Sequence, residues 1–244
     1  MSKSTGLSTR LYVNGYDLSG DVSAINSIAD SQALQDVTGL DDAAIGRLAL
    51  VADGAVSING WFNASALQEH AGLLVSGKVP TGDRGVLIPL EITLGGACFY
   101  IVSKESSYSI NRGADGSLAI ASEFASNGFG IEWGKLLTAP KTTAVSSTNG
   151  ASVDDAAATT AGATAIVQVF SLASGTVIPV IEDSANDSTF AAITGLTFTG
   201  VGTAGVPSSE RLATAATATI RRYVRLALTG TFTTAVVACG FKRG

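Results

Sequence analysis

Apolar and polar residues alternate along most of the chain, which is the pattern of half-buried β-strands. Residues 53–62 show it clearly, with Val56 and Ile58 alternating with Ala55, Ser57 and Asn59. The same type of pattern predicts strands at 10–25 (a hairpin), 85–94, 98–110, 117–126, 164–172, 176–184, 196–201, 218–230 and 233–241. The chain is therefore predicted to be mainly β, with Gly-, Asn- and Ser-rich turns between the strands.

One segment has helical spacing instead. Leu67, Ala71 and Leu74 recur at i, i+4 and i+7, Asn63 can act as an N-cap, and Gly77 suits the position after the last turn. A helix is expected at about 64–76, packed on a sheet.

A change of composition divides the chain. Ala, Ser and Thr dominate from Thr138 to Ala163 without a clear period. We predict a first domain at 1–140, a linker or first weak strand at 141–163, and an antiparallel β-sandwich at 164–244.

Charge is scarce and unevenly distributed. Only 14% of the 244 residues are charged, 46% are apolar, and the net charge is −5. Residues 1–140 carry 8 basic and 14 acidic side chains, a net −6, whereas residues 141–244 carry a net +1. This balance excludes a sequence-independent nucleic-acid binder, which needs a basic surface. A weakly charged chain rich in small residues suits a surface that partners cover.

The two cysteines, Cys98 and Cys239, lie far apart in apolar runs and are expected to be buried free thiols. The first ten residues lack the apolar core of a signal peptide, and no apolar run approaches the roughly 20 residues of a membrane helix. Synthesis and folding in a cytoplasm, without membrane insertion, are therefore expected.

The motifs do not favour an enzyme. His70 is the single histidine, no Cys/His cluster has zinc spacing, and the acidic residues offer no assignable acid–base pair. The glycines 200, 202 and 205 match a dinucleotide-binding pattern, but Pro207 follows where the helix of a βαβ unit should begin. We predict no catalytic residue, cofactor or metal.

Two stretches of the second domain are candidates for surface chemistry. Residues 182–189 contain Asp183, Asn186 and Asp187, which could bind calcium but are also ordinary turn residues. Arg221, Tyr223 and Arg225 share one strand face, which could bind an acidic ligand. Cross-strand pairs from these arginines to Glu210 or Glu182 are the favoured alternative.

Residues 5–138 resemble the major tail (tail tube) proteins of long, non-contractile-tailed bacteriophages. The resemblance rests on "LYVNGYDLSGDVSAI", "SQALQDVTGLDDAAIGRL" and "DGAVSINGWFN" with the segment after it, and on their order: strand pair, polar segment, strand, helix, strands. The second part, through "VIPVIEDSANDSTF" and "RRYVRLALTG", resembles β-sandwich domains appended to phage structural proteins.

The resemblance implies a virion protein whose tail-tube-type β-sandwich or barrel, with one flanking helix, forms stacked hexameric rings. The sheets of each ring join into one inner barrel that conducts DNA during ejection, without binding it specifically. The C-terminal sandwich decorates the outside. Other implied partners are the tape measure, tail terminator and distal tail proteins. The host cytoplasm would be the place of assembly.

Within this scheme, the acidic bias suggests a lumen that repels DNA. The candidate lumen or ring-contact residues are Asp17, Asp21, Asp36, Asp41 and Asp42, although Asp17 and Asp21 could be simple turn residues. The candidate inter-ring loop contains Ile45, Arg47, Leu48 and Leu50; a helix packed on its own domain is the alternative.

A second hypothesis is a binding module on a virion surface that recognises host glycans. Its candidate outer-domain surface comprises Asp183, Asp187, Tyr223 and Arg225.

Overall fold

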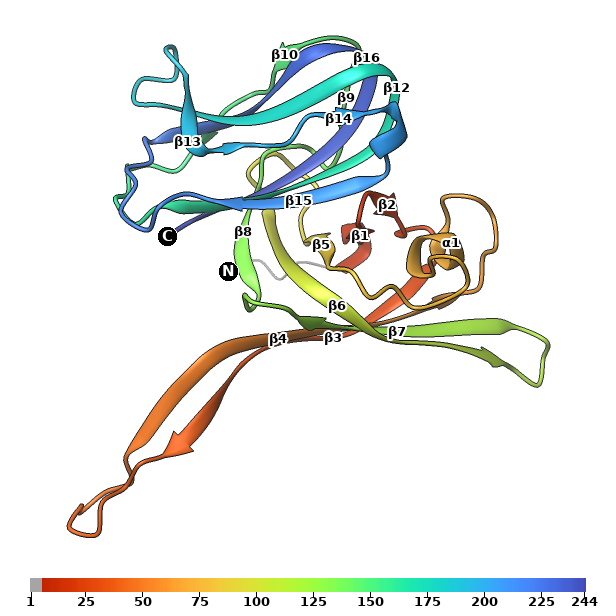
Figure 1. Ribbon diagram of the computed structural model, residues 1–244, viewed down its shortest axis with the longest axis vertical. Helices are drawn as coiled ribbons and strands as arrows, with labels where there is room; N and C mark the ends of the chain where they lie inside the picture. The colour runs from red at the N-terminus through yellow and green to blue at the C-terminus, as the bar shows by residue number, and fades with distance from the viewer. Residues whose placement is uncertain (1–5) are drawn as a thin grey trace.

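The computed structural model describes residues 6–244 and confirms a mainly β protein with a single α-helix. All strands belong to one hydrogen-bonded, antiparallel network. Figure 1 shows a sandwich built from the C-terminal half, a long twisted sheet on one side of it, and a hairpin that projects far from the body.

The twisted sheet contains four strands in the order β3 (Val22–Asp36), β4 (Arg47–Trp61), β7 (Leu118–Ser126) and β6 (Ala97–Arg112). Alternation works as expected here: Val56, Ile58, Ile120 and Phe124 all point to the covered face and are buried. The expected polar segment after the first hairpin is instead the distal half of β3. A strand of that length was missed because few apolar residues mark it.

Smaller elements cover the inner face of this sheet. They are η1 (Gly6–Ser8), β1 (Tyr12–Val13), β2 (Tyr16–Asp17), β5 (Arg84–Pro89), β8 (Glu132–Leu136) and α1 (Glu69–Leu73). β5 lies between β1 and β6, and Pro89 ends it.

The helix is shorter than the 64–76 we expected. It has five residues, because Asn63 donates to Asp21 and accepts from the Ser65 amide instead of capping a helix. Leu67 has a positive φ of 63° and is exposed, so it breaks the helical path. Beyond the helix, Val75 and Lys78 pair across a tight turn at Ser76 and Gly77.

The sandwich depends on two long strands, β12 (Ala163–Ser184) and β16 (Tyr223–Arg243), paired along their whole length. Each merges two expected strands. Gly175 and Gly230 have positive φ where the pair bends, and a Cβ at Gly175 would lie only 2.0 Å from the Thr231 carbonyl oxygen. The remaining elements are β13 (Ala191–Thr197), β14 (Val201–Gly202), η2 (Thr203–Gly205) and β15 (Ser208–Ala213).

The Ala/Ser/Thr-rich segment 141–163 carries three short strands. These are β9 (Thr142–Ala144), β10 (Thr148–Asn149) and β11 (Val153–Asp154), and all three pair with β16. The glycine motif at 200–205 forms β14 and a 3-10 turn, which gives a phosphate no helix N-terminus to bind.

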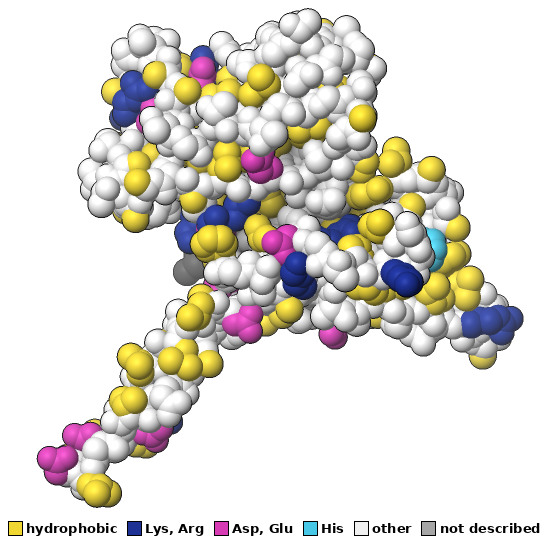
Figure 2. All heavy atoms as spheres, viewed as in Figure 1, with side chains coloured by type: hydrophobic (Ala, Val, Ile, Leu, Met, Phe, Trp, Pro, Cys, Tyr) yellow, Lys and Arg dark blue, Asp and Glu magenta, His cyan; other side chains and the backbone are white. Residues whose placement is uncertain are grey.

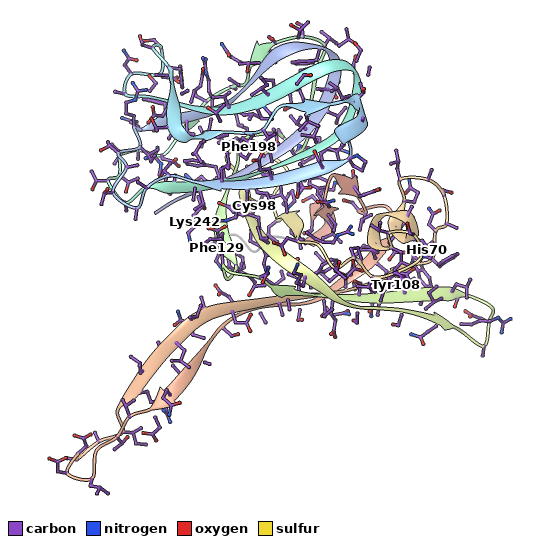
Figure 3. The ribbon with its side chains drawn as sticks, viewed as in Figure 1. His70, Cys98, Tyr108, Phe129, Phe198 and Lys242 are labelled. Carbon is purple, nitrogen blue, oxygen red and sulfur yellow. The ribbon has the colours of Figure 1, made fainter. Side chains whose placement is uncertain are left out.

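A third apolar cluster joins the sandwich to the rest of the molecule. It contains Tyr12, Leu87, Cys98, Tyr100, Leu136, Ile166 and Ala238. Buried Gln168 accepts from the Gly15 amide at 2.6 Å and donates to the Gly85 carbonyl at 3.0 Å. Arg211 forms a two-pronged ion pair with Glu132 and stacks on Phe129, which lies at this joint in Figure 3. Both cysteines are buried and free, as predicted.

Three ionisable groups are buried together at α1: Glu69 of the helix itself, Arg84 and Glu105. Glu69 is fully buried and neither of its carboxylate oxygens has a hydrogen-bond partner among the described residues. Burial, and then the nearby charges of Asp21 and Glu105, raise the pKa of Glu69 to about 8. Burial also raises the pKa of Glu105, to about 7, although Arg84 and Ser122 oppose this shift.

This arrangement predicts that the free energy of unfolding falls as the pH rises. Between about pH 4.5 and pH 8 the unfolded chain loses the Glu69 proton while the folded protein keeps it, so the folded state is progressively disfavoured. Replacing Glu69 with Gln should flatten this dependence. The free energy of unfolding of the variant, relative to that of the wild type, should therefore rise by on the order of a few kcal/mol between pH 5 and pH 9. Urea denaturation measures the effect. Glu123→Gln, at an exposed position, is the control, and an unchanged pH slope in Glu69→Gln would contradict the assignment.

Candidate assembly surface

The projecting hairpin is the candidate assembly surface, because its outer part packs against no other element of the described chain. It comprises the distal half of β3, the proximal half of β4 and the turn between them; we call residues 31–53 the arm. Almost every residue in it is exposed (Figure 1). At its root, the Trp133 indole N–H donates to Asp30 at 3.0 Å. Gly54 passes so close to Ile131 that a Cβ there would lie 2.8 Å from its side chain.

The arm is apolar as well as exposed. Seven large hydrophobic side chains, with 44–111% of their surface accessible, lie on it: Leu34, Val37, Leu40, Ile45, Leu48, Leu50 and Val51. A two-stranded ribbon is marginally stable alone, and an apolar patch of this kind marks an interaction surface. The arm is therefore suited to burial against another molecule.

The structure brings together all four residues of the predicted inter-ring loop. Ile45 lies in the turn of the arm, and Arg47, Leu48 and Leu50 lie in the first residues of β4. Most of the segment is thus strand rather than loop. The alternative of a helix packed on its own domain is wrong, because residues 39–50 contain no helix.

The five acidic candidates separate into two groups. Asp36, Asp41 and Asp42 gather at the arm tip, where Asp36 accepts from Thr38 and Asp42 accepts from the Gly39 amide. The hydrogen bonds from Thr38 lower the pKa of Asp36, so it is charged at neutral pH.

Asp17 and Asp21 bond within the body instead. Asp17 forms an ion pair with Lys141 at 2.5 Å and accepts from Ser19, and Asp21 accepts from Asn63 and from the Glu69 amide. Although burial opposes the shift, the Lys141 and Ser19 hydrogen bonds lower the pKa of Asp17.

The four-stranded sheet has an open edge on each side. Among residues 6–244, β3 pairs only with β4 along its whole length, and the segment Ser107–Arg112 of β6 pairs only with β7. Unpaired strand edges present free N–H and C=O groups to any strand that can lie beside them. A groove of about 710 Å³ follows the β3 edge, lined by Val22 to Ile28 and by Arg10, Leu11, Leu90 and Trp133.

The face of this sheet that is turned away from the sandwich (Figure 1) carries mostly small side chains. By register its small polar or apolar residues are Ala24, Ser27, Ala29, Ala55, Ser57, Asn59, Ser107, Ser109, Asn111, Ala119, Ala121 and Ala125. The same face also carries Trp61, Lys104 and Glu123, and Asp53 at the root of the arm. The five acidic candidates are not among these residues; the acids on this face are Glu123 and, at the root of the arm, Asp53. The sequence indicates this open face, because most outward positions of these strands are Ala, Ser or Asn rather than the longer polar side chains of a solvated sheet.

The candidate surface of the sandwich is occupied by internal contacts. Arg225 pairs with Glu182 at 2.7 Å, which confirms the expected cross-strand pair, and stacks on Phe190. Asp183 binds Arg221, and Asp187 accepts from Ser152. Tyr223 lies under Arg222. Glycan recognition here stays a prediction.

The segment 182–189 is a turn organised by Asn186, which accepts from Ser184, Ser188 and Thr189. Within residues 6–244, no three His, Cys, Asp or Glu side chains converge as a metal site would require. His70 is hydrogen-bonded to Tyr108 at 2.9 Å beside α1 (Figure 3). The described residues include no helix long and apolar enough to span a membrane.

No family model and no curated protein matches the sequence. Among solved structures, the chain is similar to the SPP1 Dit protein, described as a paradigm of the hub adsorption apparatus in phages infecting Gram-positive bacteria (10% identity, 96% of this chain and 99% of that chain, TM-score 0.34). It is also similar to a chain in the virion of a native gene transfer agent (19% identity, 54% and 98%, TM-score 0.40) and to one in the activated phage P2 baseplate (9% identity, 98% and 99%, TM-score 0.35). All three TM-scores are below 0.5.

The exposure of the arm predicts that its apolar side chains contribute little to the stability of a single copy. Leu40→Ser and Leu48→Ser should each change the free energy of unfolding by less than about 0.5 kcal/mol. Ile58→Ala, on the buried face of the same hairpin, should cost about 2–5 kcal/mol. Urea denaturation of dilute protein distinguishes them. A loss above about 1.5 kcal/mol for either arm variant would mean that the arm packs on its own body.

Proposed function

We propose that this protein is a structural subunit of a phage tail, which pairs edge to edge with copies of itself to form closed rings that stack into a tube. Its role is structural rather than catalytic. The observation that carries the proposal is the four-stranded sheet, which has two open edges and an open face of small side chains. The sequence resemblance to tail tube proteins points the same way and implies six copies per ring.

The directions of the four strands support lateral pairing. Because each strand is antiparallel to the next in the order β3-β4-β7-β6, the β3 edge of a second copy lies antiparallel to the β6 edge of the first. Half-buried Tyr108 and partly exposed Ile110 sit on the inner side of the β6 edge. Pairing brings them toward the apolar lining of the groove beside β3, where Ile25 and Trp133 lie. Pairing of the β6 edge with the β3 edge of a second copy thus gives the free backbone N–H and C=O groups hydrogen-bond partners and also buries apolar surface.

The open face supports a channel. In a closed ring, the sandwich lies on one side of the sheet and the small-residue face on the other, so the sandwich decorates the outside and the small residues line the lumen. Short Ala and Ser side chains leave a smooth wall. Glu123 places a carboxylate on it, which repels DNA phosphates, and the one lysine that shares this face by register, Lys104, is neutralised by Asp83 at 2.7 Å.

Blocking the β3 edge should prevent ring formation. Asn26 is exposed and is the extra residue at a bulge between Ile25 and Ser27, so it carries little of the β3–β4 ladder. Asn26→Pro and Asn26→Lys should stay folded and monomeric at concentrations where the wild type assembles.

Sedimentation velocity and negative-stain electron microscopy give the answer, with circular dichroism as the check on folding. Asn26→Ala is the matched control and should assemble normally. Rings formed by both edge-blocking variants would refute lateral pairing through β3.

Reversing the charge on the open face should slow DNA passage without stopping assembly. Virions carrying Glu123→Lys should build tails of normal length but release DNA more slowly, because a ring of ammonium groups attracts the phosphates. Glu123→Gln should differ little from the wild type. The measurement is DNA release triggered in vitro and followed by dye binding; an unchanged rate in Glu123→Lys would remove Glu123 from the channel wall.

A further inference from the structure

The sheet has two ends as well as two edges. One end is the arm tip, residues 36–47. The other, which we call the far end, is formed by Ile110, Arg112 and Leu118, which share the inner face by register where β4 finishes beside the β6–β7 turn. β4 runs from the arm tip to the far end over 15 residues, or about 50 Å at the usual rise per residue. The arm tip therefore reaches a far end only on another copy.

The two ends have opposite charge character. The arm tip has three aspartates and one arginine, a net −2. At the far end, the exposed Arg112 has no acidic partner within 4.0 Å in residues 6–244, whereas Asp115 in the adjoining turn is hydrogen-bonded to Ser117. Most other arginines of the described chain are paired with carboxylates. Figure 2 shows acidic side chains at the tip of the projecting hairpin and basic ones at the opposite end of the sheet.

Both ends also expose apolar surface. At the far end, Ile110 and Leu118 keep 45% and 40% of their surface accessible. At the arm tip, the exposed fraction reaches 111% for Leu40 and 67% for Ile45. Arg112 beside apolar side chains at the far end is complementary to the acidic arm tip, which has apolar side chains of its own. Complementary charge fixes the alignment of such a contact, and apolar burial stabilises it.

We propose that the arm tip of one copy docks on the far end of a second copy, with Asp41 and Asp42 facing Arg112 and with Leu40 and Ile45 on Ile110 and Leu118. The contact joins different surfaces on the two copies, so it repeats along the sheet direction and gives an open-ended stack. This inference rests on the proposed function and identifies the partner surface of the arm within it.

A charge exchange tests the contact. Arg112→Glu, and separately Asp41→Lys with Asp42→Lys, should leave rings intact but raise the critical concentration for tubes at least tenfold. Combining all three substitutions in one chain should bring it back to within about threefold of the wild type. Lys242→Glu, which changes a cation on the sandwich, is the control and should have no effect. Turbidity and electron microscopy report tubes, and sedimentation velocity reports rings.

The outcomes separate the two proposals. If the wild type forms no rings, the proposed function fails. If rings form and the Arg112→Glu protein stacks as well as the wild type, or if the triple variant is as impaired as its parents, the docking contact is wrong while ring formation stands.

Cross-linking gives an independent measurement. Mixing Leu40→Cys protein with Leu118→Cys protein under mild oxidation should give a disulfide-linked pair of chains. Val145→Cys, at a more exposed apolar position of the sandwich, replaces Leu118→Cys in the control and should give none. Equal yields in the two mixtures would overturn the proposed contact.

Discussion

Backbone hydrogen bonding at the edges of one sheet is the constraint on which the rest of the structure depends. The β3-β4-β7-β6 sheet is antiparallel and well covered on its inner face, yet β3 and the end of β6 each leave a row of peptide groups without strand partners. A monomeric protein usually shortens, charges or covers such edges. Here the edges are long and flanked by small or apolar residues, a composition that favours pairing with another strand over solvation.

The remaining features follow from keeping that sheet rigid and accessible. The third apolar cluster, buried Gln168 and the Arg211–Glu132 pair fix the sandwich to the inner side, so it obstructs neither the edges nor the open face. Trp133 and the close passage of Gly54 past Ile131 set the direction in which the arm leaves the body. The buried Glu69 costs stability at alkaline pH, and it belongs to α1, away from the β3 and β6 edges.

Much of the fold could be predicted because alternation is a local property. Val56, Ile58 and Phe124 point inward as their spacing requires, and the Arg225–Glu182 pair follows from strand pairing. The helix was predicted too long because the competing hydrogen bonds of Asn63 come from Asp21 and Ser65, and the first of these contacts is not local in sequence. The arm was harder still: residues 31–53 lack the burial that makes a strand pattern visible, since no other part of the described chain covers them. The sequence also could not distinguish two kinds of aspartate. Asp17 and Asp21 neutralise or cap groups of their own chain, whereas the three aspartates at the arm tip do not face its body.

Hydrogen exchange of the assembled protein against the monomer tests the central claim most directly. The account predicts that assembly slows exchange at the amides of β3 over residues 22–30 and of β6 over residues 107–112 together, while the strands of the sandwich exchange as they do in the monomer. Slowed exchange confined to β12 and β16, with both sheet edges still exchanging freely, would contradict it and place the contact between copies on the sandwich.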